Sequence, residues 1–227
     1  MKLRPLHFQS LPAIFHNTSA LMILTTLTIW FNLKVVSYHI NPIWFFVLML
    51  PTALSMSAVP FTTANPAITR LIKQMSNPIV QRAYLIARLP SVWFMRARIE
   101  RLSPKEAVVR LPFSWRSQNP FRSTYFGAQA AAAELSTGIL VALLIQGQGK
   151  ISMLVTHMEA DFHKKATHTL RFTCDEADAI IQAIQQAQKT GEGQTLTLHS
   201  KGIQTLPDGT QEVASTFSFE WSIKVKS

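Results

Sequence analysis

Cysteine and acidic residues are scarce in this chain of 227 residues. The single cysteine, Cys174, excludes an internal disulfide and suits a reducing compartment. Residues 1–101 carry ten Lys and Arg but one acid, Glu100, whereas the remaining residues carry twelve basic and eleven acidic side chains. A nucleic-acid-binding domain would carry its basic excess on its folded part. The excess here flanks apolar sequence, so we expect membrane lipid, and no nucleic acid, as a partner.

Sequence motifs for several kinds of chemistry are also missing. The chain has no Walker loop, no glycine-rich dinucleotide turn, no CxxC pair and no GxSxG nucleophile elbow, so we predict no cofactor. One predicted strand carries an alternating polar face of four residues: His157, Glu159, Asp161 and His163. Strands often present such faces to water, and we predict no metal site there.

Formal charge almost disappears between Arg4 and Arg70, where Lys34 is the only charged residue. Two apolar segments lie in this stretch, at 19–33 and 42–61, and the second is about long enough to span a bilayer. Basic residues flank the pair on both sides, so the positive-inside rule places both ends of the pair in the cytosol.

We therefore predict that residues 1–64 form a hydrophobic α-helical membrane hairpin, at the cytoplasmic face of the inner membrane. Three alternatives stay open. The segments are also compatible with a cleaved signal peptide, with core helices of a soluble domain, or with translation from an internal methionine such as Met56. A buried or unexpressed segment would make the protein cytoplasmic.

Residues 65–90 are predicted to be a basic linker of amphipathic helices. Pro66 and Pro78 each follow an Asn, and proline is favoured at the first position of a helix. Such helices either lie on an anionic membrane surface or pack on the domain that follows.

The stretch from Asn119 to Gly138 organises the rest of the chain. Turn and cap residues lead into an alanine run, and the apolar pattern predicts a helix from about Thr124 to Ile145. Its small, almost uncharged side chains indicate a buried helix that lies close to whatever covers it.

Strand patterns surround this helix. Strands are predicted at 92–102, 107–115, 151–165, 168–174, 194–206 and 210–225, with a second helix at 175–190. Two faces are predicted from alternation: Leu154, Met158, Ala160 and Phe162 share one, and Val213, Phe217, Phe219, Trp221, Ile223 and Val225 share another. The order β-β-α-β-β-α-β-β predicts an α+β fold in which an antiparallel sheet wraps a long central helix.

The helix start resembles the central-helix motif of the hotdog-fold thioesterases, nearest the phenylacetate-pathway branch and its relatives of unknown function. That motif has an Asn, a His-Gly-Gly turn and an acid seven residues after the second Gly. Asn119, Gly127 and Glu134 stand at these places, whereas Tyr125 and Phe126 replace His-Gly. The resemblance covers residues 93–226 and implies a hotdog domain over 91–227; the two replacements bear on catalysis, not on the fold.

The resemblance implies an acyl-CoA or acyl-carrier-protein thioester as substrate, and a homodimer or homotetramer with its active sites at subunit seams. Glu134 would act as base or nucleophile, and the N–H groups near Gly127 and Ala128 would hold the oxyanion. Asn119 would orient the attacking water or the helix start. Lys164 and Lys165 would lie near the coenzyme A phosphates.

Each residue also has a purely structural interpretation. Glu134 could face solvent or a seam and pair with an Arg, and Asn119 could simply belong to an Asn-Pro turn. Tyr125 and Phe126 either line an acyl pocket or fill the core. Two alternative functions follow, a non-catalytic acyl-binding or assembly module and a hydratase of the same fold, although the hydratase usually has a His near the helix start.

Overall fold

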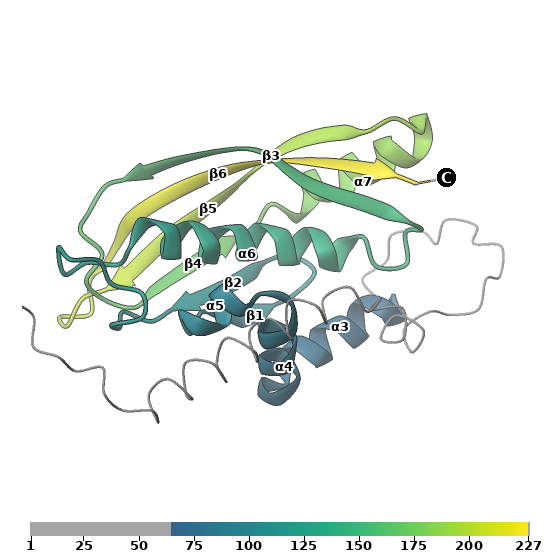
Figure 1. Cartoon of the computed structure of the whole chain (residues 1–227). Helices are drawn as coiled ribbons and strands as arrows, with labels where there is room; N and C mark the ends of the chain where they lie inside the picture. The colour runs from purple at the N-terminus through teal and green to yellow at the C-terminus, as the bar shows by residue number, and fades with distance from the viewer. Residues whose placement is uncertain (1–64, 227) are drawn as a thin grey trace, which may run out of the picture. The chain divides into compact units, whose positions relative to one another are not determined.

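The structure of this protein is a computed structural model, and it describes residues 65–226. The predicted hairpin at 1–64 lies outside the described residues. Three helices come first, and the predicted order β-β-α-β-β-α-β-β, which follows them, is confirmed (Figure 1). The elements are α3 (Pro66–Ser76), α4 (Pro78–Arg88), α5 (Pro90–Phe94), β1 (Arg98–Leu102), β2 (Ala107–Leu111), α6 (Phe126–Leu144), β3 (Ile151–Phe162), β4 (Leu170–Cys174), α7 (Ala177–Thr190), β5 (Gln194–Thr205) and β6 (Gln211–Val225).

The six strands form one antiparallel sheet in the order β1-β2-β4-β5-β6-β3. The long helix α6 lies along one face of this sheet, which curves around it (Figure 1). Leu140, Leu143 and Leu144 of the helix are fully buried, as are Phe172 and Phe217 of the sheet. Among the described helices, α6 alone is long and apolar enough to cross a membrane, but most of it is buried as a core helix.

The composition of α6 explains how closely it lies on the sheet. Ala132 and Ala133 are completely buried, since methyl side chains leave little between helix and strands. Inside this contact the Ser136 hydroxyl bonds to the Ala133 carbonyl oxygen, at 2.7 Å, and to the Ser200 hydroxyl of β5, at 2.8 Å. Buried hydroxyls of this kind must be paired, and pairing them across the interface fixes the helix on the sheet.

The helices α3 and α4 begin as the Asn-Pro pairs predict. The Asn65 side chain caps α3 and the Asn77 side chain caps α4, each accepting backbone N–H bonds. Both helices pack on the fold that follows. The Asn65 amide donates to the Gln146 carbonyl oxygen beyond α6 (2.9 Å), and the buried Gln81 amide donates to the Ile99 carbonyl oxygen of β1 (2.9 Å). The domain boundary at residue 90 stays a prediction.

The first predicted strand is too long. Val92, Trp93 and Phe94 form the end of helix α5 because Pro90 stands at its first position, and β1 begins only at Arg98. The second strand also stops early, at Leu111, before Pro112, which has no N–H to offer the next strand.

Two β-bulges overturn parts of the predicted side-chain alternation. The register of β3 on β6 shifts between Val155 and His157, so Leu154 pairs with Ser222 on the outer face and is 65% exposed. Met158 stays opposite Phe219 on the inner face. A second shift between Gly202 and Ile203 leaves Val213 37% exposed, outside the buried row. An extra residue in one strand moves every later side chain to the other face.

Candidate functional site

The N-terminus of α6 offers two free hydrogen-bond donors. Tyr125 is the N-cap residue, and its side chain makes no capping bond. The backbone N–H groups of Phe126 and Gly127 bond to no residue of the described part of the chain, whereas those of Ala128 and Gln129 bond to the Tyr125 carbonyl oxygen (3.0 and 3.1 Å). The positive end of the helix dipole lies at the same place. The donors open to a ligand are therefore the N–H groups of Phe126 and Gly127, whereas that of Ala128 is already bonded within the chain.

Two exposed aromatic rings stand beside these donors. The ring centroids of Tyr125 and Phe126 are 4.7 Å apart, and the residues are 46% and 59% exposed. The Tyr125 ring lies directly against Gly127, where an added Cβ would meet Tyr125 Cε1 at 2.6 Å. Gly127 thus gives the ring room to cover the helix start, and the rings do not fill the core.

A pocket of about 380 Å³ opens next to the helix start. It contains four of the predicted site residues: Asn119, Phe126, Lys164 and Lys165. The other lining residues are Ser123, Thr124, Gln129, Phe162, His163 and Ala166. The pocket has two exposed lysines at its rim and aromatic rings on its walls, which suits an anionic ligand with an apolar part.

Asn119 holds the loop that borders the pocket. Its Oδ1 atom accepts hydrogen bonds from the N–H of Phe121 (3.0 Å), from the N–H of Ser123 (3.2 Å) and from the Ser123 hydroxyl (3.2 Å). With this oxygen occupied, the turn interpretation describes what Asn119 does here. Any contact with water would have to come from its Nδ2 atom, which bonds to nothing among residues 65–226.

Two buried glutamines that the sequence reasoning missed support the pocket. The Gln129 Nε2 atom donates to the Thr124 carbonyl oxygen (3.1 Å), and its Oε1 atom accepts from the Ser215 hydroxyl (2.8 Å). Gln204 donates to the Lys165 carbonyl oxygen at 3.0 Å and accepts from the N–H groups of the two residues after Ala166. The sequence contained one sign of this role, because Gln129 is a lone polar residue inside an otherwise apolar run.

Glu134 lies on a different part of α6. Its side chain is partly buried, and burial raises the pKa of its carboxyl group above the usual 4.5. Its Oε1 atom lies next to Gly138, which leaves room both for the carboxylate and for the edge of the Trp221 ring. No hydrogen bond or ion pair joins the carboxylate to any described residue, so the predicted Arg partner is absent from this part of the chain.

Helix α4 faces this carboxylate. Burial raises the pKa of the Tyr84 hydroxyl, the nearby Arg88 opposes this increase, and the Glu134 charge adds to it. Tyr84 is thus close enough to Glu134 to interact with it electrostatically, a neighbour that the sequence reasoning did not connect to the site. The surroundings of Glu134 therefore include the Trp221 ring beside Gly138 and the phenol of Tyr84.

One chain does not bring Glu134 and Gly127 together. Seven residues of α-helix separate them, which is about 10 Å along the axis. Glu134 does not line the pocket. A site that uses both groups must therefore take one of them from another subunit.

The other candidate groups have simpler surroundings. His157 and Glu159 contact each other at 3.4 Å on the exposed face of β3, and the described residues contain no group of three or more metal-ligating side chains. Cys174 is buried, and desolvation raises the pKa of its thiol to about 12, so it is a neutral structural thiol.

Comparison with known proteins agrees with this architecture. A protein of unknown function from Chlorobaculum tepidum has 14% identity and a TM-score of 0.59, over 72% of this chain and 99% of its own. A probable thioesterase from Pseudomonas aeruginosa has 22% identity and a TM-score of 0.53, over 66% and 97%. A candidate thioesterase from Shewanella oneidensis has 14% identity and a TM-score of 0.54, over 70% and 99%.

These likenesses confirm the fold, and the chain has a thioesterase-like hotdog fold. A family model, "Domain of unknown function (DUF4442)", matches residues 77–199, and the chain belongs to this family. No curated protein matches the chain.

Proposed function

We propose that this protein hydrolyses an acyl thioester of coenzyme A or acyl-carrier protein, at a seam between two subunits. The observation that carries the proposal is the Glu134 carboxylate, which is partly buried against Trp221, has no partner in the described chain and has a raised pKa. A carboxylate of this kind is a better base near neutral pH than an ordinary one.

In this mechanism Glu134 of one subunit removes a proton from a water molecule that attacks the thioester carbonyl. The free N–H groups of Phe126 and Gly127 of the other subunit stabilise the oxyanion that forms. The intermediate then collapses, the carbon–sulfur bond breaks, and the thiolate leaves. Lys164 and Lys165, at the rim of the pocket, would neutralise phosphate groups of the carrier.

Substitution at Glu134 tests this proposal. Glu134→Gln keeps the size of the side chain but removes the base, so thiol release from a panel of acyl-CoA substrates should fall by roughly a hundredfold or more. Glu192→Gln, at an exposed position in the α7–β5 turn, is the matched control and should keep parental activity. Activity close to parental in Glu134→Gln, with a lowered melting temperature, would show that Glu134 is structural.

A second candidate function is a non-catalytic acyl-binding module. It is favoured by Tyr125, which stands at the His position of the thioesterase motif and whose ring covers Gly127. This module would bind acyl-CoA and release no thiol. Tyr125→His separates the two candidates: a gain of hydrolysis indicates a natural binder or slow enzyme, whereas a loss shows that Tyr125 belongs to a working site.

A further inference from the structure

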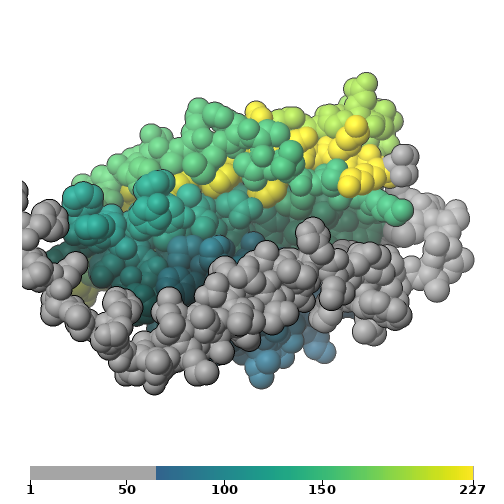
Figure 2. Space-filling view, viewed as in Figure 1, coloured from purple at the N-terminus to yellow at the C-terminus, as the bar shows by residue number. Residues whose placement is uncertain are grey.

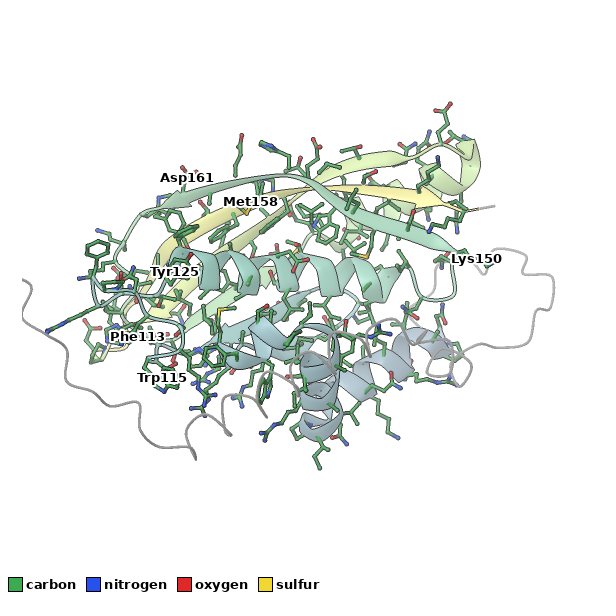
Figure 3. The ribbon with its side chains drawn as sticks, in the orientation of Figure 1. Phe113, Trp115, Tyr125, Lys150, Met158 and Asp161 are labelled. Atoms are coloured by element: carbon green, nitrogen blue, oxygen red, sulfur yellow. The ribbon has the colours of Figure 1, made fainter. Side chains whose placement is uncertain are left out.

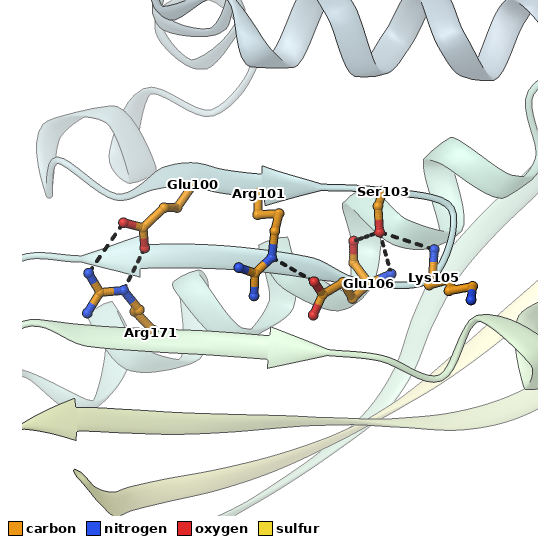
Figure 4. Close-up of polar contacts among 6 residues, drawn as sticks. All are labelled: Glu100, Arg101, Ser103, Lys105, Glu106 and Arg171. Carbon is orange, nitrogen blue, oxygen red and sulfur yellow. Dashed lines mark hydrogen bonds and ion pairs between the residues drawn. The ribbon is translucent and has the colours of Figure 1, made fainter. Parts of the chain in front are cut away.

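An unusual row of arginines crosses the outer face of the sheet. Arg98 of β1 pairs in register with Arg110 of β2, and Arg110 pairs with Arg171 of β4, so all three side chains lie on one face. Among the described residues, Glu100 is the acid that pairs with this row, and it reaches over β2 to Arg171 (2.7 Å; Figure 4). Like charges directly opposite each other destabilise a sheet, so folding alone does not explain this row.

The arginines continue toward an exposed aromatic pair. The rings of Phe94 and Trp115 meet edge to face at 5.8 Å, and Trp115 is 68% exposed. The Arg116 guanidinium lies 5.5 Å from the Phe94 ring centroid and 5.2 Å from that of Trp115. Trp115 lies at the same end of the molecule as Tyr125 and away from Lys150 (Figure 3).

Chain geometry makes these two groups one surface. The segments 94–98 and 110–116 run antiparallel, because they are paired at Arg98 and Arg110 and meet again at Phe94 and Trp115. We call the result the arginine–tryptophan surface: Phe94, Arg96, Arg98, Arg110, Trp115 and Arg116. None of its four arginines forms an ion pair with a residue of the described chain. Burial is the largest cause that lowers the pKa of Arg110; the positive charges of Arg98, Arg171 and Arg96 lower it further, and Glu100 opposes them.

Arg96 gives independent support. Its φ is 62°, in the left-handed region that favours glycine, and a side chain there strains the backbone. Glycine would make the turn between α5 and β1 without this strain. An arginine at such a position, beside three others without an ion-pair partner in the described chain, points to a use for its charge.

We propose that the arginine–tryptophan surface docks on an anionic phospholipid bilayer. Guanidinium groups bind phosphodiesters through several donors, and Trp and Arg together suit the boundary between headgroups and acyl chains. Helix α4, which packs against α5, also exposes Ile79 (79%) and Ile86 (46%). Exposed aliphatic side chains gain free energy by entering lipid but contribute nothing to phosphate binding in a nucleic acid.

The test uses the full chain with an environment-sensitive dye on Trp115→Cys, since Cys174 is buried and does not react. The protein is incorporated into phosphatidylcholine vesicles with or without phosphatidylglycerol. We expect a blue shift of the dye only with phosphatidylglycerol, reversed by salt. The same dye on Gln185→Cys, at an exposed position of α7, should show no shift.

Two arginine variants sharpen the result. Loss of two charges in Arg98→Gln/Arg110→Gln should weaken docking about 25-fold and remove most of the shift. Arg96→Gly should weaken docking about fivefold while the melting temperature stays level or rises, which a purely structural arginine would not do.

Several outcomes would overturn the proposal: an equal shift in phosphatidylcholine alone, an equal shift at Gln185, or a shift that survives the double arginine substitution. A shift produced by single-stranded RNA without vesicles would assign the surface to nucleic acid instead. The readout is independent of thioester hydrolysis, so the proposed function and this surface can fail separately.

Discussion

At the scale of single residues, Glu134 links stability to pH. Burial raises the pKa of its carboxyl group in the folded state, so folding favours the protonated form. Its favourable contribution to the free energy of unfolding is therefore complete below the ordinary value of 4.5 and is lost as the pH rises through the raised pKa. We expect Glu134→Gln to melt at or above the parental temperature at neutral pH, with no gain at low pH. A variant that melts lower than the parent at neutral pH would contradict this.

The same pKa should shape the rate of hydrolysis. If the Glu134 carboxylate is the base, kcat/KM should increase with pH through its raised pKa and then level off. The pH range over which kcat/KM rises should be higher than the range in which an ordinary glutamate carboxyl group titrates. A pH series on the parent and on Glu192→Gln should show the same limb, and the residual activity of Glu134→Gln should lack it. An identical limb in Glu134→Gln would assign it to another group.

The effects of substitutions at Gly127 and Tyr125 on thiol release should be coupled. A Cβ at residue 127 would lie 2.6 Å from Tyr125 Cε1, so Gly127→Ala must push the exposed ring away from the helix start. We expect little loss of stability, because the ring can move into solvent, but a clear change in thiol release. In the Tyr125→Ala background the same substitution should have almost no effect. A double-mutant cycle measures this coupling, and strictly additive effects would show that the ring does not cover the donors.

At the scale of elements, the sheet is most sensitive to side-chain volume at Gly202 of β5, which lies opposite the bulge in β6. A Cβ at Gly202 would meet Phe172 Cε1 at 2.5 Å and Ser215 Oγ at 2.8 Å, both inside the core. Gly202→Ala should therefore lower the free energy of unfolding by about 1–3 kcal/mol, measured by denaturant titration. Gly193→Ala, where the nearest atom would be 3.8 Å away, should change it little. Equal effects of the two substitutions would refute this.

The predictable elements are those whose signals are local. The alanine run and its flanking turn residues gave α6 within two residues at each end, and the Asn-Pro pairs gave the starts of α3 and α4. Bulges are different, because they depend on how two strands pair over a distance. The exposure of Leu154 and Val213 follows from such shifts, and alternation along one strand carries no sign of them.

The candidate site was predictable only in part for the same reason. Asn119, Phe126, Lys164 and Lys165 line one pocket, and their roles toward a substrate stay predictions. The contacts that hold the pocket come from residues far apart in the sequence, such as Gln204 on the Lys165 turn. Glu134 matches its motif position, but Tyr84, its neighbour on α4, comes from outside the stretch that the resemblance covers.

At the scale of the whole molecule, membrane attachment remains a proposal from the sequence. The near absence of charge between Arg4 and Arg70 predicts that the full-length protein pellets with membranes and resists carbonate extraction. A chain that starts at Asn65 should be soluble or bind membranes in a salt-sensitive way. Full-length protein released by carbonate would exclude the hairpin.

Strand β3 is the other whole-molecule feature, because among the described strands it lies at an edge of the sheet and pairs with β6 alone. Its green residues lie at the surface along the upper part of Figure 2. Three of its apolar side chains are exposed: Leu154, Met158 and Phe162. An exposed apolar edge needs cover, and a second copy of the chain would supply it. We expect light scattering of the detergent-solubilised protein to give at least a dimer, and Met158→Lys to shift it toward monomer.

Mixing two inactive variants tests whether the active site is shared between subunits. Glu134→Gln lacks the base. Gly127→Pro lacks one oxyanion donor, and proline is tolerated in the first turn of a helix. A heterodimer of the two variants has two active sites at its interface, and one of them combines an intact Glu134 with an intact Gly127. Equal amounts of the variants, refolded or exchanged together, should therefore recover about a quarter of the parental rate. Recovery should disappear when both variants also carry Met158→Lys. A mixture no more active than its components would show that Glu134 and Gly127 do not act together across a subunit seam.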